Sequence, residues 1–358
     1  MFDKSTWIRL PRNVVVGHGV LEQTGDVVAD LHLTGRPLVV TSPTPREVAG
    51  ERVRDLLSDA RADTGADTDP ALVEVDEASF AAVERVIEAA RETGAGYLVG
   101  VGGGKAIDIA KMAAEDRDIG FVSVPTAASH DGIVSGRGSV PERDTRHSVA
   151  AEPPLAVVAD TEILAEAPWR LTTAGCADII SNYTAVRDWE LAHRLQNVEY
   201  SEYAGALSRM TAEMLVQNAD SIKEGLEESA WVVVKALVSS GVAMSIAGSS
   251  RPASGAEHLF SHRLDRLAPE AALHGHQVGV GAIMTEYLHT GENGDWRDVR
   301  RALTAIGAPT TAADLGVDEA TVIEALTTAH EIRDRYTVLG NGMNEAAARE
   351  AATVTGVI

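Results

Sequence analysis

Cysteine and lysine are nearly missing from this sequence of 358 residues. Cys176 is the single cysteine, so the chain can form neither an internal disulfide nor a zinc cluster built from thiolates. Five of the 31 basic residues are lysines, and the other 26 are arginines. Against 53 acidic residues they leave a net charge of −22, which argues against nucleic acid and anionic membranes as partners. Such a composition is typical of a protein kept soluble in concentrated salt, and an ordinary acidic enzyme is the alternative.

Long apolar runs and targeting signals are missing as well. No apolar run approaches the roughly 20 residues that cross a membrane, so we expect no membrane insertion. Residues 1–7 contain no basic stretch followed by an apolar core, and we therefore expect no signal peptide. Together these absences predict a cytoplasmic protein.

Alternating strand and helix patterns fill the first 160 residues, an order typical of a mainly parallel sheet covered by helices. Strands are predicted over 13–17, 37–42, 71–75, 97–101 and 119–124. From Asp160 onward long helical patterns dominate, over 172–192, 202–222, 228–247, 254–265, 275–289, 295–306 and 318–334. We therefore predict a Rossmann-like α/β domain over residues 1–160 and an all-helical domain over residues 161–358, with a ligand in the cleft between them.

A glycine-rich segment follows the predicted strand over 97–101. It reads Gly102-Gly-Gly-Lys-Ala-Ile-Asp108 and leads into a helical pattern. Glycines between a strand and a helix let backbone N–H groups approach an anion, and a diphosphate fits such a place. The segment is neither the common dinucleotide fingerprint nor a P-loop, because Lys105 and Ala106 stand where those motifs need Gly and Ser or Thr. A tight turn without a ligand is the alternative.

Two further loops follow predicted strands, where ligands of parallel sheets bind. Thr41-Ser-Pro-Thr44 has hydroxyls but no carboxylate that would repel a 2′-phosphate, so we predict that NADP is used as well as NAD. The alternative is that this segment only caps the next helix. The loop Pro125-Thr-Ala-Ala-Ser-His-Asp-Gly-Ile-Val-Ser135 offers hydroxyls and backbone donors to a nicotinamide ribose. Asp131 and Gly132 in it are equally consistent with a plain turn.

The predicted helical domain contains candidate metal ligands. His258 and His262 are four residues apart and so share one face of a helix, while His274 and His276 follow closely. Asp178 lies near the start of a strongly apolar helix. One carboxylate and two imidazoles with an open position make a catalytic zinc site, but spacing alone does not choose two ligands among the four histidines. Surface or capping histidines are the alternative.

These motifs together resemble a known superfamily. The glycine segment, the loop at 125–135, Gly175-Cys-Ala-Asp178, Glu257-His258 and His274-Gly-His-Gln-Val-Gly279 occur in this order in the superfamily of glycerol dehydrogenases, iron-type alcohol dehydrogenases and dehydroquinate synthase. Within it, residues 179–192 are most similar to the archaeal sn-glycerol-1-phosphate dehydrogenases. The resemblance covers nearly the whole chain and implies a dehydroquinate synthase-like fold.

The resemblance implies roles for individual residues. The cofactor diphosphate is implied to bind to Gly102, Gly103, Gly104, Lys105 and Ala106. The nicotinamide side is implied to be lined by Thr126, Ala127, Ala128, Ser129 and Ser135. Zinc is implied to be held by Asp178, His258 and His274. Asp131 and His262 are implied to contact the substrate, with Asp178 near it as well.

The implied reaction is the reduction of dihydroxyacetone phosphate to sn-glycerol 1-phosphate by NADH or NADPH, for archaeal ether-lipid synthesis. His262 or a water chain is our candidate proton donor. Arg251 is a candidate phosphate contact, with a surface ion pair as its alternative. We also expect a homo-oligomer. The rival functions are a glycerol dehydrogenase acting on unphosphorylated glycerol, a dehydroquinate synthase-like lyase, and a metal- or nucleotide-binding protein without catalysis.

Overall fold

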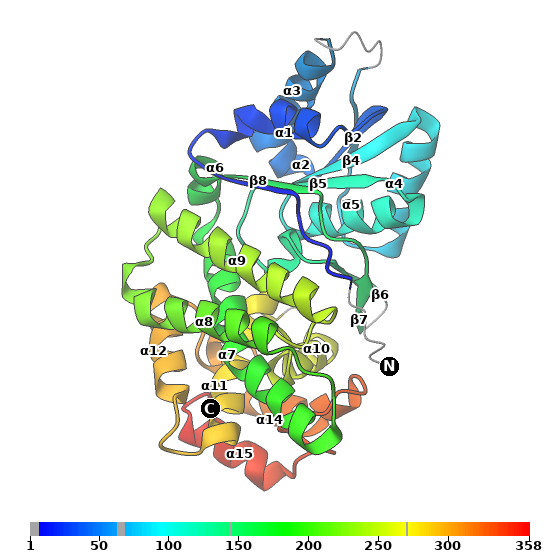
Figure 1. Ribbon diagram of the computed structural model, residues 1–358. Coiled ribbons are helices and arrows are strands. Elements are labelled where there is room, and N and C mark those ends of the chain that lie inside the picture. The colour runs from blue at the N-terminus through cyan, green and yellow to red at the C-terminus, as the bar shows by residue number, and fades with distance from the viewer. Residues whose placement is uncertain (1–6, 63–68, 143–144, 270) are drawn as a thin grey trace.

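Six parallel strands form one sheet in the computed structural model, which describes residues 7–62, 69–142, 145–269 and 271–358. Within these residues the strands lie in the order β1-β8-β5-β4-β2-β3 (Figure 1). Their bounds are Asn13–Gly17 (β1), Arg36–Thr41 (β2), Ala71–Glu74 (β3), Ala95–Gly102 (β4), Gly120–Pro125 (β5) and Ala156–Asp160 (β8). The predicted parallel α/β architecture is confirmed. Residues 1–6, on which the expectation about a signal peptide depends, lie outside the described residues.

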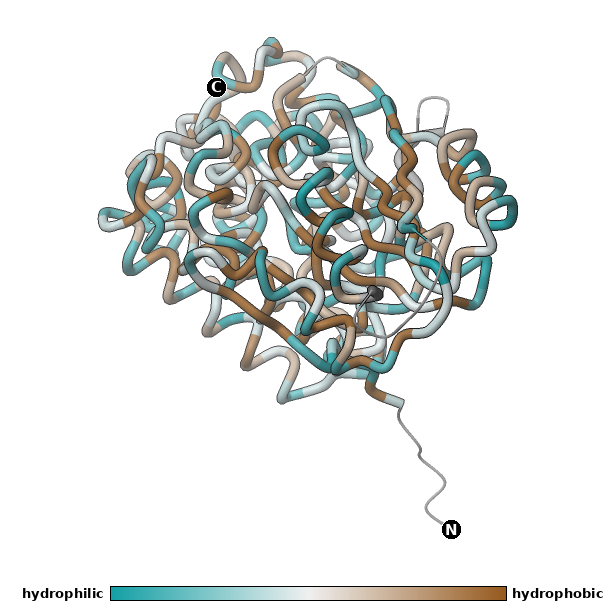
Figure 2. Tube along the Cα trace, turned by 90° about the horizontal axis from the view of Figure 1, so that it is seen from above, coloured by the Kyte–Doolittle hydropathy of each residue, from teal (hydrophilic) through white to brown (hydrophobic). Residues whose placement is uncertain are grey.

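Successive residues of the central strands pack into two different cores. In β4, Leu98 packs with α4 (Phe80–Thr93) and α5 (Gly104–Arg117), whereas Val99 packs with α1 (Thr24–Asp30) and α3 (Glu51–Ala62). Side chains of a strand alternate between its faces, so a sheet covered on both sides requires an uninterrupted apolar run. Figure 2, seen from above, shows apolar segments running through the middle of the molecule and hydrophilic ones on its outer helical turns.

Proline opens a helix after β2. Pro43 and Pro45 lie just beyond the end of β2 at Thr41. They form a short turn of helix, Pro43–Pro45 (α2), that continues through the π-helical segment Arg46–Gly50 (η2) into α3. Proline suits the first helical turn because its missing N–H would have no partner there.

The rest of the chain is a helical bundle built around α7 (Trp169–Gln196), which packs on α8 (Glu202–Asn218) and α11 (His274–Thr290). The remaining helices are α6 (Thr161–Glu166), α9 (Glu227–Ala247), α10 (Ala256–Leu267), α12 (Trp296–Ile306), α13 (Ala312–Leu315), α14 (Glu319–Thr328) and α15 (Glu345–Val354), with 3₁₀ turns at Val20–Gln23 (η1), Asp131–Ile133 (η3), Ala219–Ser221 (η4) and Ala329–Glu331 (η5). The predicted helices are all present. The one expected to reach residue 334 ends at Thr328, and α6, α13 and α15 were not predicted.

The expectation that no apolar segment reaches membrane-spanning length is wrong for helix α9. It has 21 residues, and 18 of them average a hydropathy of 1.7, so its length and composition alone would allow it to cross a membrane. Core helices of folded proteins have the same composition. Here Val233, Val234 and Leu237 are fully buried in the bundle.

A hairpin links the two halves of the molecule. The antiparallel strands β6 (Arg137–Glu142) and β7 (Thr145–Ala150) leave the main sheet and reach the helical half, where β7 contacts α10 (Figure 1). The hairpin therefore carries Arg137, from the α/β half, to the side of the helical half.

Candidate active site

A cavity of about 330 Å³ lies where the carboxyl ends of the sheet strands face the helical half. The α/β half contributes the start of α5 with Gly104 and Lys105, and the loop after β5 with Ser129. The helical half contributes residues of α7 and α10 and the first two residues of α11. Residues far apart in the sequence thus line one space, as expected for a ligand site between two halves of a fold.

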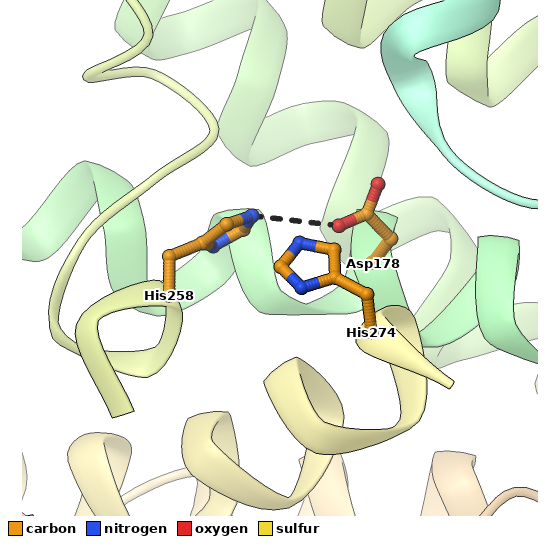
Figure 3. Close-up of side chains that lie close together, drawn as sticks. All are labelled: Asp178, His258 and His274. Carbon is orange, nitrogen blue, oxygen red and sulfur yellow. Dashed lines mark ion pairs between the residues drawn. The ribbon is translucent and has the colours of Figure 1, made fainter. Parts of the chain in front are cut away.

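Three candidate metal ligands meet in this cavity. Asp178 from α7, His258 from α10 and His274 from α11 each offer a ligand atom, and the three atoms lie within 4.8 Å of one another. His258 Nε2 is 3.6 Å from Asp178 Oδ1. Figure 3 shows the three side chains converging from three separate elements. One carboxylate and two imidazoles of this spacing are the donors that a catalytic zinc ion uses.

Both imidazoles are held by hydrogen bonds from their outer nitrogens. His258 Nδ1 is 3.0 Å from Oε1 of the fully buried Glu257, a carboxylate that only accepts, so this nitrogen donates. Ser261 Oγ donates to Gln277 Oε1 at 2.9 Å and therefore accepts from His274 Nδ1 at 2.8 Å. Because Nδ1 of each ring is engaged in this way, Nε2 is the nitrogen that would bind a metal after losing its proton, and such outer hydrogen bonds orient ligands in metal sites.

Negative charge is concentrated around these imidazoles. Burial, followed by repulsion from Asp178, raises the pKa of Asp131 to about 6. Burial by itself lowers the pKa of His258, but the carboxylates of Asp178 and Glu257 outweigh it and raise that pKa to about 9. The cluster therefore stabilises positive charge at its centre. A divalent cation fits both this charge and the donor atoms.

The other two histidines are arranged differently. The ring of His262 stacks on that of His274 with centroids 5.4 Å apart, and His262, Asp265 and His274 form a second group of closely spaced ligand atoms. His276 instead lies against Thr173, with 2.9 Å between Nε2 and Oγ1, and burial lowers its pKa to about 4. Three of the four candidate histidines thus line the cavity, and His276 does not.

Asp131 connects the two halves at the cavity. Its backbone N–H donates to Asp178 Oδ2 at 3.2 Å, and its own Oδ2 accepts from Ser240 Oγ of α9 at 2.8 Å. The loop after β5 is thereby tied to two helices of the helical half, and its carboxylate is held beside the candidate metal ligands.

The glycine segment also borders the cavity, through Gly104 and Lys105. Gly103 is the N-cap of α5, and a Cβ added to it would meet no atom within 4 Å. Space and free helical N–H groups in front of a helix N-terminus suit a diphosphate. The exposed Lys105 donates from Nζ to the Asp76 carbonyl at 2.6 Å. Four of the ten residues implied to bind cofactor line the cavity, namely Gly104, Lys105, Ser129 and Ser135. Five others are buried and do not line it, namely Gly102, Ala106, Thr126, Ala127 and Ala128.

Sequence reasoning missed the residues that hold the loop after β5 in place. Lys111, fully buried in α5, donates from Nζ to Asp108 Oδ1 at 3.2 Å and to the carbonyls of Gly132 and Arg137. The other Asp108 oxygen, Oδ2, is 3.5 Å from His130 Nε2. Lysine is rare here and almost never buried without a partner, so Lys111 on an apolar helix was the available signal.

Sequence reasoning also missed the two arginines of the cavity. Arg137 and Arg333 line it, whereas Arg251 does not. Burial, followed by repulsion from Arg137, lowers the pKa of Arg333. Burial and the neighbouring Arg333 and Arg251 lower the pKa of Arg335 to about 9. Two guanidinium groups therefore line the cavity, with Arg335 close to both, although the chain as a whole is strongly acidic.

Known proteins are similar to this chain in sequence and in fold. The family of iron-containing alcohol dehydrogenases matches residues 15–168. The glycerol-1-phosphate dehydrogenase (NAD(P)+) of Haloarcula marismortui is 76% identical over 358 residues, covering 100% of both chains. That of Methanosarcina acetivorans is 56% identical over 357 residues, covering 99% of this chain and 98% of its own. The crystal structure of a probable glycerol dehydrogenase from Sinorhizobium meliloti 1021 has the same fold, with a TM-score of 0.78 at 23% identity and 98% of each chain covered. By its full-length similarity to these archaeal relatives, the chain belongs to the family of glycerol-1-phosphate dehydrogenases (NAD(P)+).

Proposed function

We propose that this protein reduces dihydroxyacetone phosphate to sn-glycerol 1-phosphate with NADH or NADPH and a zinc ion. The observation that carries the proposal is one cavity lined by three kinds of group. They are the cluster of Asp178, His258 and His274, the glycine segment at the start of α5, and the arginines Arg137 and Arg333. A metal, a dinucleotide and a phosphorylated ketone need these three kinds of group.

The arginines favour a phosphorylated substrate over glycerol. Two half-buried guanidinium groups repel each other, and a phosphate dianion between them would remove that repulsion while forming charge-assisted hydrogen bonds. Glycerol carries no charge and would leave both arginines uncompensated. Arg137 and Arg333, rather than Arg251, are therefore our candidates for the phosphate contacts.

Asp178, His258 and His274 would hold the zinc ion, which supplies Lewis-acid polarisation of a carbonyl group when bound. Zinc suits this ligand set because two neutral imidazoles and one carboxylate leave an open coordination position. Glu257 and Ser261 would keep both rings oriented, since they fix the outer nitrogen of each.

The glycine segment, residues 102–106, would bind the cofactor diphosphate through backbone N–H groups. The nicotinamide, which supplies a hydride, would lie along the loop of residues 126–135. Ser135 supports this placement because its buried hydroxyl has no hydrogen-bond partner among the described residues. Thr41, Ser42 and Thr44 have no carboxylate to repel a 2′-phosphate, so both cofactors would be accepted.

Reduction adds a hydride to the carbonyl carbon and a proton to its oxygen. His262 borders the cavity and would deliver that proton, directly or through water, while Asp131 would bind a substrate hydroxyl. We place this chemistry between an α/β domain of residues 1–160 and a helical domain of residues 161–358, in a cytoplasmic enzyme whose product enters archaeal ether-lipid synthesis.

The test is NADPH oxidation with dihydroxyacetone phosphate or with dihydroxyacetone, with and without a chelator, followed by a chiral assay of the product. We expect turnover of the phosphorylated ketone, loss of turnover with the chelator and recovery with zinc. His258→Ala should lose zinc and turnover while keeping its far-UV circular dichroism. Equal turnover of both ketones would favour a glycerol dehydrogenase, and product formation without net NADPH consumption would favour a lyase.

A further inference from the structure

An arginine paired with two carboxylates lies at the ends of β2 and β3. Arg46, the first residue of η2, donates from Nε to Glu51 Oε1 at 2.6 Å and from Nη1 to Glu74 Oε1. The side chains of Arg46, Glu51 and Glu74 have exposed fractions of 40%, 34% and 33%. They therefore fix one another but remain accessible to a ligand.

The sheet brings Glu74 to the segment after β2. Glu74 is the last residue of β3 and is paired in register with Thr41, the last residue of β2. The Val75 N–H extends this pairing by donating to the Thr41 carbonyl at 2.8 Å. The segment of residues 41–44 has no carboxylate of its own, so a carboxylate reaches it from the neighbouring strand.

Arg46 and Glu74 lie on the side of the glycine segment where the adenosine of a dinucleotide would lie. In the proposed binding mode the diphosphate is at the end of β4 and the nicotinamide extends along the loop after β5. Since the strand order is β5-β4-β2-β3, the adenosine would extend the other way, over the ends of β2 and β3. Neighbouring strands are about 4.8 Å apart, so a ribose joined to the diphosphate would reach the end of β2.

Pro45 connects this region to the glycine segment. A Cβ added to Gly102 would lie 3.4 Å from Pro45 Cβ, and Pro45 directly precedes Arg46. The helical turn that contains Pro45 continues through η2 into α3. Arg46 is therefore held close to the glycine segment by helical backbone.

We propose that Arg46 and Glu74 govern the choice between NADPH and NADH by exchanging partners. With NADPH, Arg46 would turn from Glu74 to the 2′-phosphate of the adenosine ribose, because a guanidinium group binds phosphate through two parallel hydrogen bonds. With NADH, Glu74 would accept a hydrogen bond from the ribose 2′-hydroxyl, as carboxylates at this place in nucleotide-binding sheets do. The proposal rests on the dinucleotide part of the proposed function and not on the ketone.

The exchange requires little rearrangement. Ion pairs exposed to solvent contribute little to stability, so releasing Glu74 costs little. Glu51 remains paired with Nε of Arg46 and keeps the guanidinium group in place while its Nη atoms face the phosphate. In the free protein Arg46 neutralises Glu74, so this carboxylate does not exclude NADPH as an unpaired one would.

Lys105 is a second cation in this region. Its Nζ donates to the carbonyl of Asp76, two residues beyond the end of β3. Lys105 belongs to the glycine segment, so we expect it to contact the diphosphate, which NADH and NADPH share. It would therefore strengthen the binding of both cofactors without distinguishing them.

Isothermal titration calorimetry of the full-length protein with adenosine 2′,5′-bisphosphate and with 5′-AMP tests the proposal. These two ligands differ only in the 2′-phosphate, and the salt concentration is held constant because salt screens exposed charges. Arg46→Met should weaken the bisphosphate at least tenfold and leave 5′-AMP within twofold. Glu74→Gln should tighten the bisphosphate at least threefold and should not tighten 5′-AMP. This opposite shift keeps the test valid if Arg46→Met does not fold.

Arg52→Met is the matched control. Arg52 also belongs to the helix that follows η2, and its Nε donates to Glu22 Oε1 at 2.8 Å. Glu22 lies in η1, which follows β1 at the other edge of the sheet from β3. The control removes a comparable exposed ion pair and should leave both dissociation constants unchanged.

Steady-state kinetics provide a second measurement. Arg46→Met should raise KM for NADPH at least tenfold, with kcat and KM for NADH within twofold of wild type. An unchanged ratio of the two dissociation constants in Arg46→Met and in Glu74→Gln overturns the proposal, and so does a ratio that responds to Lys105→Met instead. The titrations contain no ketone, so the assignment of Arg46 and Glu74 can fail while the proposed substrate stands, and the reverse.

Discussion

Nδ1–H of His274 donates to the Ser261 hydroxyl oxygen across 2.8 Å, and the Ser261 hydrogen is committed to Gln277. Gln277 is itself fixed, because its Nε2 donates to Asp265 Oδ1 and to the Ala272 carbonyl. A chain of three hydrogen-bonded groups therefore holds Nδ1 of His274, and Nε2 is the nitrogen that would bind a metal.

Ser261→Ala should weaken zinc binding about 10- to 100-fold, because His274 loses the group that fixes its ring and its protonation. The measurement is zinc competition with a chelating dye. Thr173→Ala removes the corresponding partner of His276 and is the matched control, for which we expect unchanged zinc affinity. If Thr173→Ala weakens zinc binding and Ser261→Ala does not, the assignment of His274 as the ligand is wrong.

Arg333→Met should lower kcat/KM for dihydroxyacetone phosphate about 100-fold, a loss of about 2.7 kcal/mol, because a buried phosphate contact disappears. The Michaelis constant for NADPH should stay unchanged, since Arg333 is not among the residues proposed to bind the cofactor. Arg209→Met, which breaks an ion pair with Glu190 away from the cavity, is the control. Unchanged kinetics of the Arg333 variant would remove it from the phosphate site.

Two neighbouring glycines should respond differently to alanine. A Cβ at Gly104 would lie 2.4 Å from His130 Cε1, so Gly104→Ala must displace that ring and should lower the melting temperature by several degrees. A Cβ at Gly103 meets nothing within 4 Å, so Gly103→Ala should keep its melting temperature. If the diphosphate fills that space, Gly103→Ala should nevertheless bind NADPH at least tenfold more weakly in a fluorescence titration. Wild-type affinity in the Gly103 variant would place the diphosphate elsewhere.

Glu286 predicts a pH dependence of stability. It is fully buried in α11, and burial raises its pKa to about 7 although Arg187 Nε is 3.1 Å from Oε2. The folded protein therefore binds this proton more tightly than the unfolded chain. The resulting stabilisation is complete below about pH 4.5 and is lost as the pH rises through 7. Glu286→Gln should remove this dependence and raise the free energy of unfolding at pH 8 by about 2 kcal/mol relative to wild type.

Denaturant unfolding at pH 5 and pH 8 measures the effect, with the exposed Glu292→Gln as control. If the free energy of unfolding changes between pH 5 and pH 8 by the same amount in the wild type and in Glu286→Gln, Glu286 ionises normally.

Local pattern predicted most of the elements and several of the residues that line the cavity. The apolar run at 97–101 predicted a strand buried on both faces because strand side chains alternate between two cores. The glycines after it predicted a turn open enough for an anion. The end of the helix at Thr328 was not predictable in this way, since the following residues continue a helical pattern. Arg333 enters the cavity because the helix stops before it.

The order of residues by itself determined the α/β and helical halves, the acidic surface and the residue types available for a metal and a dinucleotide, because periodicity and composition are local properties. Only the tertiary structure decided that His274 meets Asp178 and His258 while His276 packs against Thr173, although the two histidines are two residues apart. It also brought Arg137 from a hairpin and Arg333 from a loop to one cavity. Successive positions of a helix point in directions about 100° apart, so which of them reaches a site depends on how the helix packs against its neighbours.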